Sequence, residues 1–333
     1  MSRPFSLIIC TYMRHKALLT LLNSVKGQTL YPDEIIVVDG SANNETQRSL
    51  ELNSFKNLSY FKVGSKNKGL TKQRNFGINK LSKHTEIVCF LDDDTELERD
   101  YFEILIDTYN KKPEAIAVGG YIINEVKWKP VQESSCSKTF CFDGWERDEP
   151  LRFRLRKPLG LLPDVPPGFL PSFSHGRAVG FLPPSGKIYE VEQIMGCALS
   201  CKKKVFDNLR FSTYFEGYGL YEDADFCLRL AKIGKLYINT AARLNHYHDH
   251  SGRPNKFKYG KMVVRNGWYV WRVKYPCPSF KARFKWHATA FLLTLIRFSN
   301  IATTSKKQEA LTEGLGRVVG WLSLLINKPK VSA

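Results

Sequence analysis

Short apolar, β-branched segments alternate with segments of helical spacing in the first part of the chain, and this pattern constrains the fold most strongly. The apolar segments cover residues 6–10, 34–38, 60–63, 86–91 and 115–122, and the segments of helical spacing cover 16–26, 44–52, 71–81 and 99–109. Strands that alternate with helices form a mostly parallel sheet with helices on both faces. The sequence therefore predicts an α/β fold with a Rossmann-like, mostly parallel sheet flanked by helices.

Polar residues follow three of the predicted strands, as Thr11-Tyr12, Asp39-Gly40-Ser41 and Asp92-Asp93-Asp94. Open sheets of this kind bind ligands beyond the carboxyl ends of their strands. Three adjacent carboxylates repel one another unless a cation neutralises them, so the last of these segments suits Mg²⁺ or Mn²⁺, which would complete its shell with phosphate oxygens and water. The alternative is an acidic loop that is only solvated at the start of a helix.

A second acidic cluster, Glu222, Asp223 and Asp225, starts a predicted helix over residues 222–233. Glycines precede it at 217 and 219, and they allow the backbone to pass close to a ligand. A carboxylate at such a helix start can point into a cleft and act as a general base. Further along, histidines 246, 248 and 250 follow a predicted strand over 235–240.

The regular pattern gives way to a Pro- and Gly-rich segment over residues 127–187. A segment of this length in a compact enzyme is expected to be a lid or an acceptor-binding insertion, and a disordered surface excursion is the alternative. We therefore predict a catalytic domain over residues 1–254 that contains this insertion. A basic, helical C-terminal region is predicted to follow over residues 255–333.

Positive charge is concentrated in that last region. Lys and Arg outnumber Asp and Glu by 50 to 32, and no acidic residue lies between Asp249 and Glu309. Basic residues over 258–272 fall on one helical face and apolar residues on another, while the apolar segment 286–296 is too short to span a bilayer. Residues 255–300 are thus expected to dock on an anionic membrane surface, with ordinary packing on the catalytic domain as the alternative.

The cysteines and the N-terminus bear on the cellular compartment. Eight cysteines are scattered without the spacing of zinc or redox motifs, and the N-terminal segment lacks a secretory cleavage pattern. We therefore expect reduced thiols and a cytoplasmic protein that associates peripherally with the inner face of the membrane.

Six short segments occur in a fixed order along residues 5–253. They are Cys10-Thr11-Tyr12, Val37-Val38-Asp39-Gly40-Ser41, residues 67–75, Phe90-Leu91-Asp92-Asp93-Asp94, residues 195–200, and Glu222-Asp223-Ala224-Asp225-Phe226. Each alone is a weak signal. In this order they resemble the inverting, family-2 glycosyltransferases of the A-type fold that act in bacterial glycan biosynthesis.

The resemblance implies a nucleoside-diphosphate sugar as donor, a UDP-sugar in the first place and a dTDP-sugar as the alternative. Thr11, Tyr12 and Asp39 would bind the base and ribose. Arg74, on the helix beside the nucleotide, would neutralise or orient it. Asp93 would lie near the ribose.

It also implies a role for each acidic cluster. Asp92 and Asp94 would hold Mg²⁺ or Mn²⁺, and His246 or His248 would complete the metal shell or contact the diphosphate. Asp223, or alternatively Glu222, would deprotonate the acceptor hydroxyl in a single displacement that inverts the anomeric carbon. The acceptor implied is a glycan or a lipid-linked glycan.

The chain departs from one pattern of the wider superfamily. Processive polysaccharide synthases carry a Gln-x-x-Arg-Trp segment after the base, together with transmembrane helices, and the sequence shows neither. Addition of a single sugar is therefore expected.

Three other functions compete with this interpretation. A sugar nucleotidyltransferase also uses a parallel sheet with acidic metal ligands, although the Gly-x-x-x-x-Gly-Lys phosphate loop is absent. A basic nucleic-acid-binding protein would suit the net charge, but the two acidic clusters would repel a phosphate backbone, so no nucleic-acid partner is expected. An inactive scaffold that keeps the fold is the third.

Overall fold

The computed structural model describes residues 3–131, 138–215, 217–249 and 254–331. Internal contacts divide the chain into unit 1, made of Met1–Lys127 and Leu182–Gly252, and unit 2, made of Trp128–Phe181 and Arg253–Ala333. Most of the Pro- and Gly-rich segment therefore groups with the C-terminal helices, whereas the sequence predicts it as an insertion in the catalytic domain.

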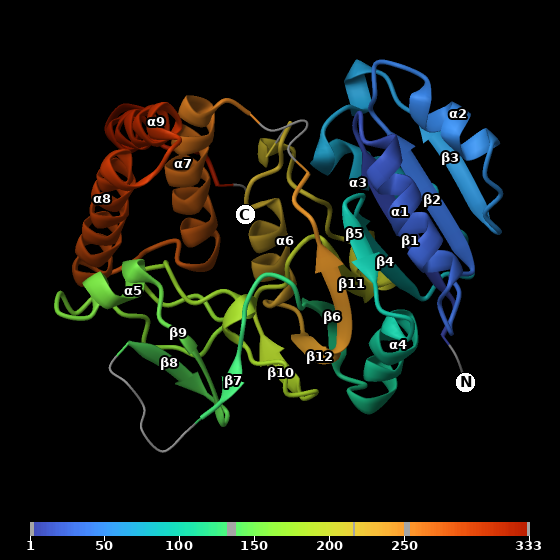
Figure 1. Ribbon diagram of the computed structural model, residues 1–333, viewed down its shortest axis with the longest axis horizontal. Helices are drawn as coiled ribbons and strands as arrows, with labels where there is room; N and C mark the ends of the chain where they lie inside the picture. The colour runs from blue at the N-terminus through green and yellow to red at the C-terminus, as the bar shows by residue number, and fades with distance from the viewer. Residues whose placement is uncertain (1–2, 132–137, 216, 250–253, 332–333) are drawn as a thin grey trace. The chain divides into compact units, whose positions relative to one another are not determined.

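Unit 1 is built on one sheet with the strand order β10-β12-β6-β11-β4-β1-β2-β3, in which β5 also pairs with β12 (Figure 1). The strands are β1 Phe5–Thr11, β2 Glu34–Asp39, β3 Leu58–Lys62, β4 Ile87–Asp92, β5 Thr95–Leu97, β6 Ala115–Ile122, β10 Ile188–Val191, β11 Ala198–Lys202 and β12 Lys235–His246. The β3-β2-β1-β4 part is parallel, as predicted. Strand β11 lies antiparallel between β4 and β6, so the whole sheet is mixed.

Helices cover both faces of this sheet. They are α1 His15–Lys26, α2 Glu45–Glu51, α3 Leu70–Ile78, α4 Tyr101–Lys111 and α6 Glu222–Leu230. Leu7 of β1 belongs to a core with Leu21 of α1 and Phe102 of α4. Ile8 points to the opposite face, where a Cβ on Gly77 of α3 would lie 2.8 Å from Ile8 Cγ2. Glycine is thus required where α3 approaches the sheet.

Unit 2 contains a small sheet and a group of helices. The sheet has the order β7-β9-β8, with β7 Lys129–Pro130, β8 Thr139–Phe142 and β9 Trp145–Asp148. The helices are α5 Leu151–Arg156, α7 Lys256–Lys274, α8 Phe280–Thr303 and α9 Lys307–Ile326. The α/β class and the C-terminal helical region predicted from the sequence are confirmed.

A tryptophan stack lies in the core of unit 2. The rings of Trp271 in α7 and Trp286 in α8 are parallel within 13°, with centroids 5.5 Å apart. Both side chains are 1% exposed, and Phe173 joins the same cluster. These two tryptophans are therefore core residues of the unit, where the sequence pattern had suggested a membrane-facing helix. Within the described ranges, no helix is both long enough and apolar enough to cross a bilayer.

Aromatic and thiol side chains are unevenly divided between the units. All six tryptophans fall in the ranges of unit 2. The described cysteines of unit 1 are buried or half-buried and free, whereas Cys141 and Cys277 of unit 2 are exposed and free. Cys136 lies outside the described residues.

Candidate active site

The carboxyl ends of three neighbouring strands place the predicted donor-site residues together. In the parallel register Thr11 of β1 pairs with Asp39 of β2, and Cys10 pairs with Asp92 of β4. Thr11 and Asp39 are buried, and the Asp92 side chain is about one-third exposed. The sequence signals at these strand ends thus meet at a single edge of the sheet.

Asp39 accepts hydrogen bonds from two donors, one in the loop after β2 and one in β3. Its Oδ1 accepts from the Ser41 backbone N–H at 2.7 Å and its Oδ2 accepts from the Tyr60 hydroxyl at 2.8 Å. Burial and the adjacent Asp39 carboxylate raise the pKa of Tyr60. The hydroxyl therefore remains a proton donor to Asp39 and fixes its orientation.

Tyr12 lies at the surface beside this edge. Its side chain is 37% exposed, and the Lys68 ammonium sits 4.4 Å from the centre of its ring. Gln73 of α3 ties the backbone beneath, because its Nε2 donates to the carbonyls of Thr11 at 3.1 Å and Val38 at 2.8 Å. An exposed aromatic ring is a surface on which a base can stack.

Asp93 is buried and interacts with one neutral and one positively charged side chain. It accepts from Thr11 Oγ1 at 2.7 Å and forms an ion pair with Arg14 at 3.1 Å. Burial raises the pKa of Asp93 to about 7, although Arg14 and Thr11 act in the opposite direction.

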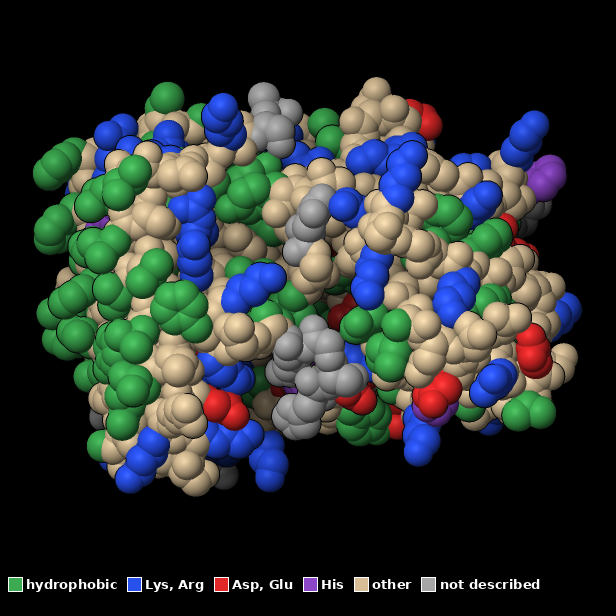
Figure 2. All heavy atoms as spheres, turned by 90° about the horizontal axis from the view of Figure 1, so that it is seen from above, with side chains coloured by type: hydrophobic (Ala, Val, Ile, Leu, Met, Phe, Trp, Pro, Cys, Tyr) green, Lys and Arg blue, Asp and Glu red, His purple; other side chains and the backbone are tan. Residues whose placement is uncertain are grey.

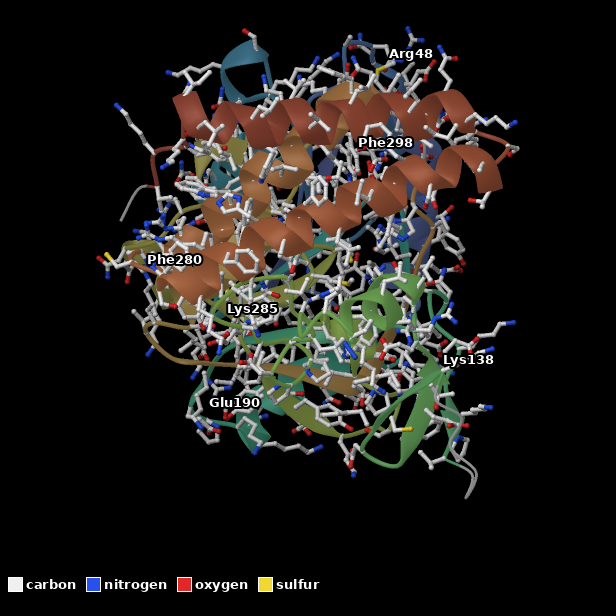
Figure 3. All side chains as sticks on the ribbon, turned by 90° about the vertical axis from the view of Figure 1, so that its left-hand side faces the viewer. Arg48, Lys138, Glu190, Phe280, Lys285 and Phe298 are labelled. Atoms are coloured by element: carbon white, nitrogen blue, oxygen red, sulfur yellow. The ribbon has the colours of Figure 1, made fainter. Side chains whose placement is uncertain are left out.

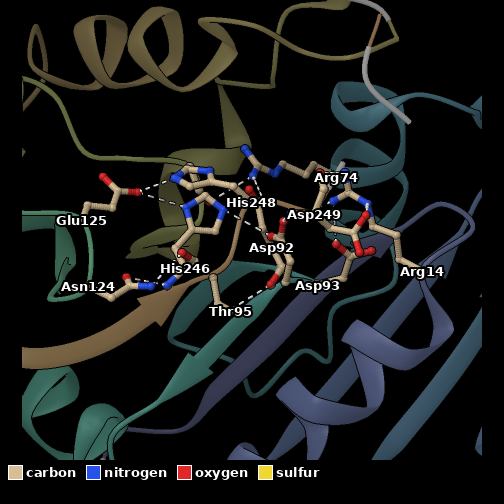
Figure 4. Close-up of polar contacts among 12 residues, drawn as sticks. Arg14, Arg74, Asp92, Asp93, Thr95, Asn124, Glu125, His246, His248 and Asp249 are labelled. Atoms are coloured by element: carbon tan, nitrogen blue, oxygen red, sulfur yellow. Dashed lines mark hydrogen bonds and ion pairs between the residues drawn. The ribbon is translucent and has the colours of Figure 1, made fainter. Parts of the chain in front are cut away.

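Asp94 has the opposite electrostatic balance to Asp93, and Figure 4 shows the polar contacts around Asp92, Asp93 and His246. Asp94 contacts His246 Nε2 at 3.3 Å, accepts from the Asp249 N–H at 2.8 Å and lies 3.5 Å from Arg14. Burial acts to raise the pKa of Asp94, but these three groups outweigh it and lower the pKa to about 2. Asp94 is therefore a permanent anion at neutral pH.

His246, the last residue of β12, and His248, two residues beyond it, share an acidic neighbour. Glu125 lies 3.5 Å from His246 Nδ1 and 2.7 Å from His248 Nε2, and the two rings are 3.9 Å apart. Burial acts to lower the pKa of His246, but Asp94, Cys197 and Glu125 outweigh it and raise the pKa to about 12. His250 lies outside the described residues.

Two overlapping groups of side chains have the spacing of metal ligands. One oxygen each from Asp92 and Asp94 and one nitrogen of His246 all lie within 4.8 Å of one another, and the same holds for Glu125, His246 and His248. Asp94 Oδ1 is buried and lies 3.3 Å from His246 Nε2. An oxygen-rich set with one imidazole fits a divalent cation such as Mn²⁺. His246 belongs to the group with Asp92 and Asp94, and His248 does not.

Arg74 joins the two acidic clusters. Its guanidinium is buried, forms an ion pair with Asp92 at 3.2 Å, donates to the Gly196 carbonyl at 2.9 Å and forms a close ion pair with Glu222. Burial acts to lower the pKa of Arg74, but Glu222 and Asp92 outweigh it and raise the pKa. A Cβ on Gly196 would lie 2.9 Å from Glu222 Oε1 and 3.0 Å from Arg74 Nη1, so a side chain at this position would press on the ion pair.

Asp223 follows Glu222 at the start of α6, after a turn in which Tyr221 has a φ of +71°. Its Oδ2 accepts from the Gly196 N–H at 3.0 Å and its Oδ1 from the Ala224 N–H at 2.8 Å. Burial raises the pKa of Asp223, and these two N–H groups partly oppose the rise. Asp92, Arg74, Gly196 and Asp223 are therefore linked, and clusters more than a hundred residues apart in sequence converge in one network.

The structure adds residues that the sequence analysis did not select. Arg14 neutralises Asp93 and Asp94, and Glu125 contacts both histidines. Arg14 follows β1 and Glu125 follows β6, so both could have been found by inspecting every segment after a predicted strand. Gly196 lies in the segment 195–200 selected from the sequence, but the sequence predicts no role for it, because its role depends on side chains that arrive from distant segments.

The chain is similar to several known proteins in its sequence. The model of the family described as Glycosyl transferase family 2 matches residues 6–171. The glucosyl-dolichyl phosphate glucuronosyltransferase of Haloferax volcanii is 32% identical over 123 residues, which cover 35% of this chain and 38% of that protein. The O-antigen chain rhamnosyltransferase RfbN of Salmonella typhimurium is 33% identical over 92 residues, 28% of each chain. The matched parts thus span well under half of these relatives.

Solved structures show the same fold at low sequence identity. The crystal structure of S. aureus TarS 1–349 has a TM-score of 0.53 at 14% identity, covering 97% of this chain and 81% of that one. The crystal structure of GalNAc-T7 with UDP, GalNAc and Mn²⁺ has a TM-score of 0.52 at 16% identity, covering 88% and 58%. With the family match and the sequence relatives, these likenesses lead to one assignment: the chain belongs to glycosyltransferase family 2.

Proposed function

We propose that the protein transfers a single sugar from a nucleoside-diphosphate sugar, in the first place a UDP-sugar, to a hydroxyl of a glycan or lipid-linked acceptor. The reaction inverts the anomeric carbon and uses Mg²⁺ or Mn²⁺. It takes place on the cytoplasmic side, next to an anionic membrane surface. The observation that carries the proposal is the Arg74 junction, which links Asp92 of the metal-ligand group to Glu222 and Asp223 at the start of α6.

Several findings support the choice of donor and acceptor. The family assignment favours sugar transfer over the nucleotidyltransferase and nucleic-acid alternatives. One neighbour in fold was solved with UDP and Mn²⁺. One relative is named for a dolichyl-phosphate-linked glucose and another for the O-antigen chain, which favours a lipid-linked or polysaccharide acceptor.

The donor end is formed by the edge of the sheet. Asp39, fixed by Ser41 and Tyr60, presents a carboxylate to the N–H of a pyrimidine base, and Tyr12 offers a ring on which that base stacks. Asp92, Asp94 and His246 would hold the cation. When bound, that cation neutralises negative charge on the departing diphosphate. Arg14 provides further positive charge beside Asp93 and Asp94.

The acceptor proton goes to Asp223. Glu222 is engaged by Arg74, whereas Asp223 is oriented by the N–H groups of Gly196 and Ala224. The raised pKa of Asp223 makes its carboxylate a stronger base than an exposed aspartate. Asp223 takes the hydroxyl proton while the acceptor oxygen attacks the anomeric carbon from the side opposite the diphosphate.

Replacement of Asp223 tests the base. We expect Asp223→Asn to lower transfer by about 10²- to 10⁴-fold, because general-base catalysis is lost, while the affinity for UDP with Mn²⁺ is retained. Asp207→Asn, at an exposed position of unit 1, is the matched control. Normal turnover by the Asp223→Asn enzyme would exclude this residue as the base.

Replacement of Asp94 tests the cation site. Asp94→Ala should weaken UDP binding measured with Mn²⁺ and leave binding measured with a chelator unchanged, because only the metal-dependent part is lost. A turnover assay separates the two chemistries: release of UDP from a UDP-sugar and an acceptor supports sugar transfer, and release of pyrophosphate from UTP and a sugar 1-phosphate contradicts it.

A further inference from the structure

Large apolar side chains lie on the surface of unit 2 along two helices. Phe280, Phe284 and Phe291 of α8 and Leu315, Leu322 and Leu325 of α9 are each at least 44% exposed. We call these six residues the α8–α9 apolar face. Single exposed apolar residues are ordinary, but a group of them on adjacent helices marks an interaction surface.

The residues of this face form two stripes that run side by side. Within each helix they recur at helical spacing. The helices are antiparallel neighbours, because Trp321 of α9 donates to His287 of α8 at 2.9 Å and Gly314 of α9 meets the ring of Phe298. Figure 2 shows apolar side chains gathered along the edge occupied by α8 and α9, and Figure 3 shows both helices lying across that side.

The packing of α9 is the reverse of that expected for a helix in water. Its buried side carries glycines: a Cβ on Gly316 would lie 2.0 Å from the carbonyl oxygen of Phe257 in α7, and one on Gly320 would lie 3.0 Å from that of Lys261. Leu324 is buried, but the other four leucines of α9, at 311, 315, 322 and 325, are exposed on the surface. A helix in water buries its large apolar side chains, whereas helices in lipid pack through small residues and turn the large ones outward.

Basic residues border the α8–α9 apolar face. Lys281 and Arg283 are exposed next to the phenylalanines at the start of α8, and Lys306 and Lys307 are exposed at the turn between the helices. The acidic residues of α9 are neutralised within the unit, Glu309 by Lys256 at 3.3 Å and Glu313 by Arg297 and Arg317 at 2.9 and 2.8 Å. An apolar face with a positive rim is complementary to anionic lipid.

From this combination we infer that the α8–α9 apolar face inserts into the interface of an anionic lipid bilayer, with Lys281, Arg283, Lys306 and Lys307 at the level of the headgroups. The inference rests on the proposed function in that it names the membrane beside which the lipid-linked acceptor would be used. It assigns the contact to exposed residues of α8 and α9, not to the buried Trp271 and Trp286.

Vesicle co-sedimentation of the full chain tests the inference. The wild-type protein should sediment with vesicles of phosphatidylcholine and phosphatidylglycerol at moderate salt, and much less with phosphatidylcholine alone. Phe284→Glu combined with Leu322→Glu should lower the partition coefficient by at least about tenfold, since two apolar side chains are lost from the inserted face. Lys281→Glu with Lys306→Glu should reduce binding to the anionic vesicles specifically.

Matched substitutions in unit 1 serve as controls. Leu52→Glu replaces a leucine that is 86% exposed, and Lys204→Glu replaces an exposed lysine, so both should bind like the wild type. If the α8–α9 variants bind as well as these controls, the inference is wrong. It is also wrong if the wild type ignores anionic vesicles and forms a dimer that the α8–α9 variants dissociate, because the face would then join two copies of the chain.

A more conservative substitution tests the inference if the Phe284→Glu and Leu322→Glu variants do not fold. Phe284→Trp keeps an aromatic ring on the face and adds a fluorophore. Brominated anionic vesicles should quench its emission beyond that of the wild type, and equal quenching would overturn the inference. The assays also separate this inference from the proposed sugar transfer. Vesicle binding without sugar transfer contradicts the transfer alone. Transfer to a soluble acceptor without vesicle binding contradicts this inference and the proposed membrane location, but not the transfer.

Discussion

A buried guanidinium is tolerable only when its charge and its donors are matched, and Arg74 meets this requirement. Asp92 and Glu222 supply negative charge, and the Gly196 carbonyl accepts another of its N–H groups. The rings of Phe90 and Phe211 lie 5.7 and 5.1 Å from the guanidinium carbon. Removing one member of such a group leaves the remaining charges buried and unpaired.

Replacement of Arg74 should therefore destabilise unit 1 strongly. For Arg74→Met we expect a loss of about 3–5 kcal/mol in the free energy of unfolding, the usual result of breaking a buried ion pair. Far-ultraviolet circular dichroism in a urea titration measures it. Arg48→Met, at an exposed position of α2, should change stability by no more than about 0.5 kcal/mol. Equal effects of the two substitutions would contradict the assignment of Arg74 as the junction.

His175 of unit 2 should make stability depend on pH. Burial, with Arg156 and Arg317 nearby, lowers the pKa of His175 from 6.5 to about 3. Between these values the unfolded chain binds a proton that the folded unit excludes, so stability falls as the pH is lowered through this window. Going from pH 7 to pH 5 should cost about 2 kcal/mol from this residue alone.

The His175→Asn variant should lose less stability on acidification than the wild type does. Asparagine suits the site because the φ of His175 is +58°. Urea titrations followed by tryptophan emission report on unit 2, which holds all six tryptophans. His84→Asn, at an exposed position, is the control. An unchanged pH dependence in the His175→Asn variant would show that another group is responsible.

At the scale of elements, helix α9 depends on glycine for its place against α7. Alanine favours a helix over glycine by about 1 kcal/mol. Gly316→Ala should nevertheless lower the free energy of unfolding of unit 2 by a net of about 1–3 kcal/mol, because the new Cβ would lie 2.0 Å from the Phe257 carbonyl oxygen. Tryptophan emission in urea measures the change. Leu315→Ala, one residue away and exposed, should stay within about 0.5 kcal/mol. A gain in stability for Gly316→Ala would mean that α7 and α9 are less closely packed.

Elements with a strong local pattern were predictable from the sequence, and those that depend on distant partners were not. Strands β1, β2 and β4 and helices α1 and α4 lie within two residues of their predicted limits at each end. Strand β5 has three residues and the strands of the small sheet have two to four, too few to show a period. The same reasoning applies to the site: Asp39 and Asp92 follow predicted strands, whereas Gly196 is defined only by Arg74 and Glu222 around it.

At the scale of the whole molecule, unit 2 is assembled from two distant stretches of chain. Trp271 Nε1 donates to the Ser172 carbonyl at 2.8 Å, and Lys274 Nζ and the Tyr275 hydroxyl both donate to the Leu170 carbonyl. Contacts between residues about a hundred positions apart leave no local pattern in a sequence. The sequence therefore predicts a single boundary at residue 254 and does not show that residues 128–181 group with the C-terminal helices.

Truncation of the chain after residue 254 tests whether the segment 128–181 depends on the C-terminal helices for its folding. A chain of residues 1–254 would lack Trp271 and Trp286, against which Phe173 packs, so the segment 128–181 should become sensitive to trypsin. Limited digestion of the truncated and full-length chains, with mapping of the cleavage sites, measures the difference. Equal resistance of the segment in both chains would show that it folds without the C-terminal helices.

The rate at which the buried thiols of unit 1 are alkylated measures how often the sheet that carries the candidate site opens. Burial raises the pKa of Cys10 to about 12 and that of Cys197 to about 11, so almost no thiolate is present at neutral pH and a maleimide cannot reach most of these sulfurs. Cys141 and Cys277, being exposed, are alkylated at once. The rate of the slow phase of alkylation therefore reports the rate of transient opening of unit 1, and the measurement needs neither a donor nor an acceptor sugar.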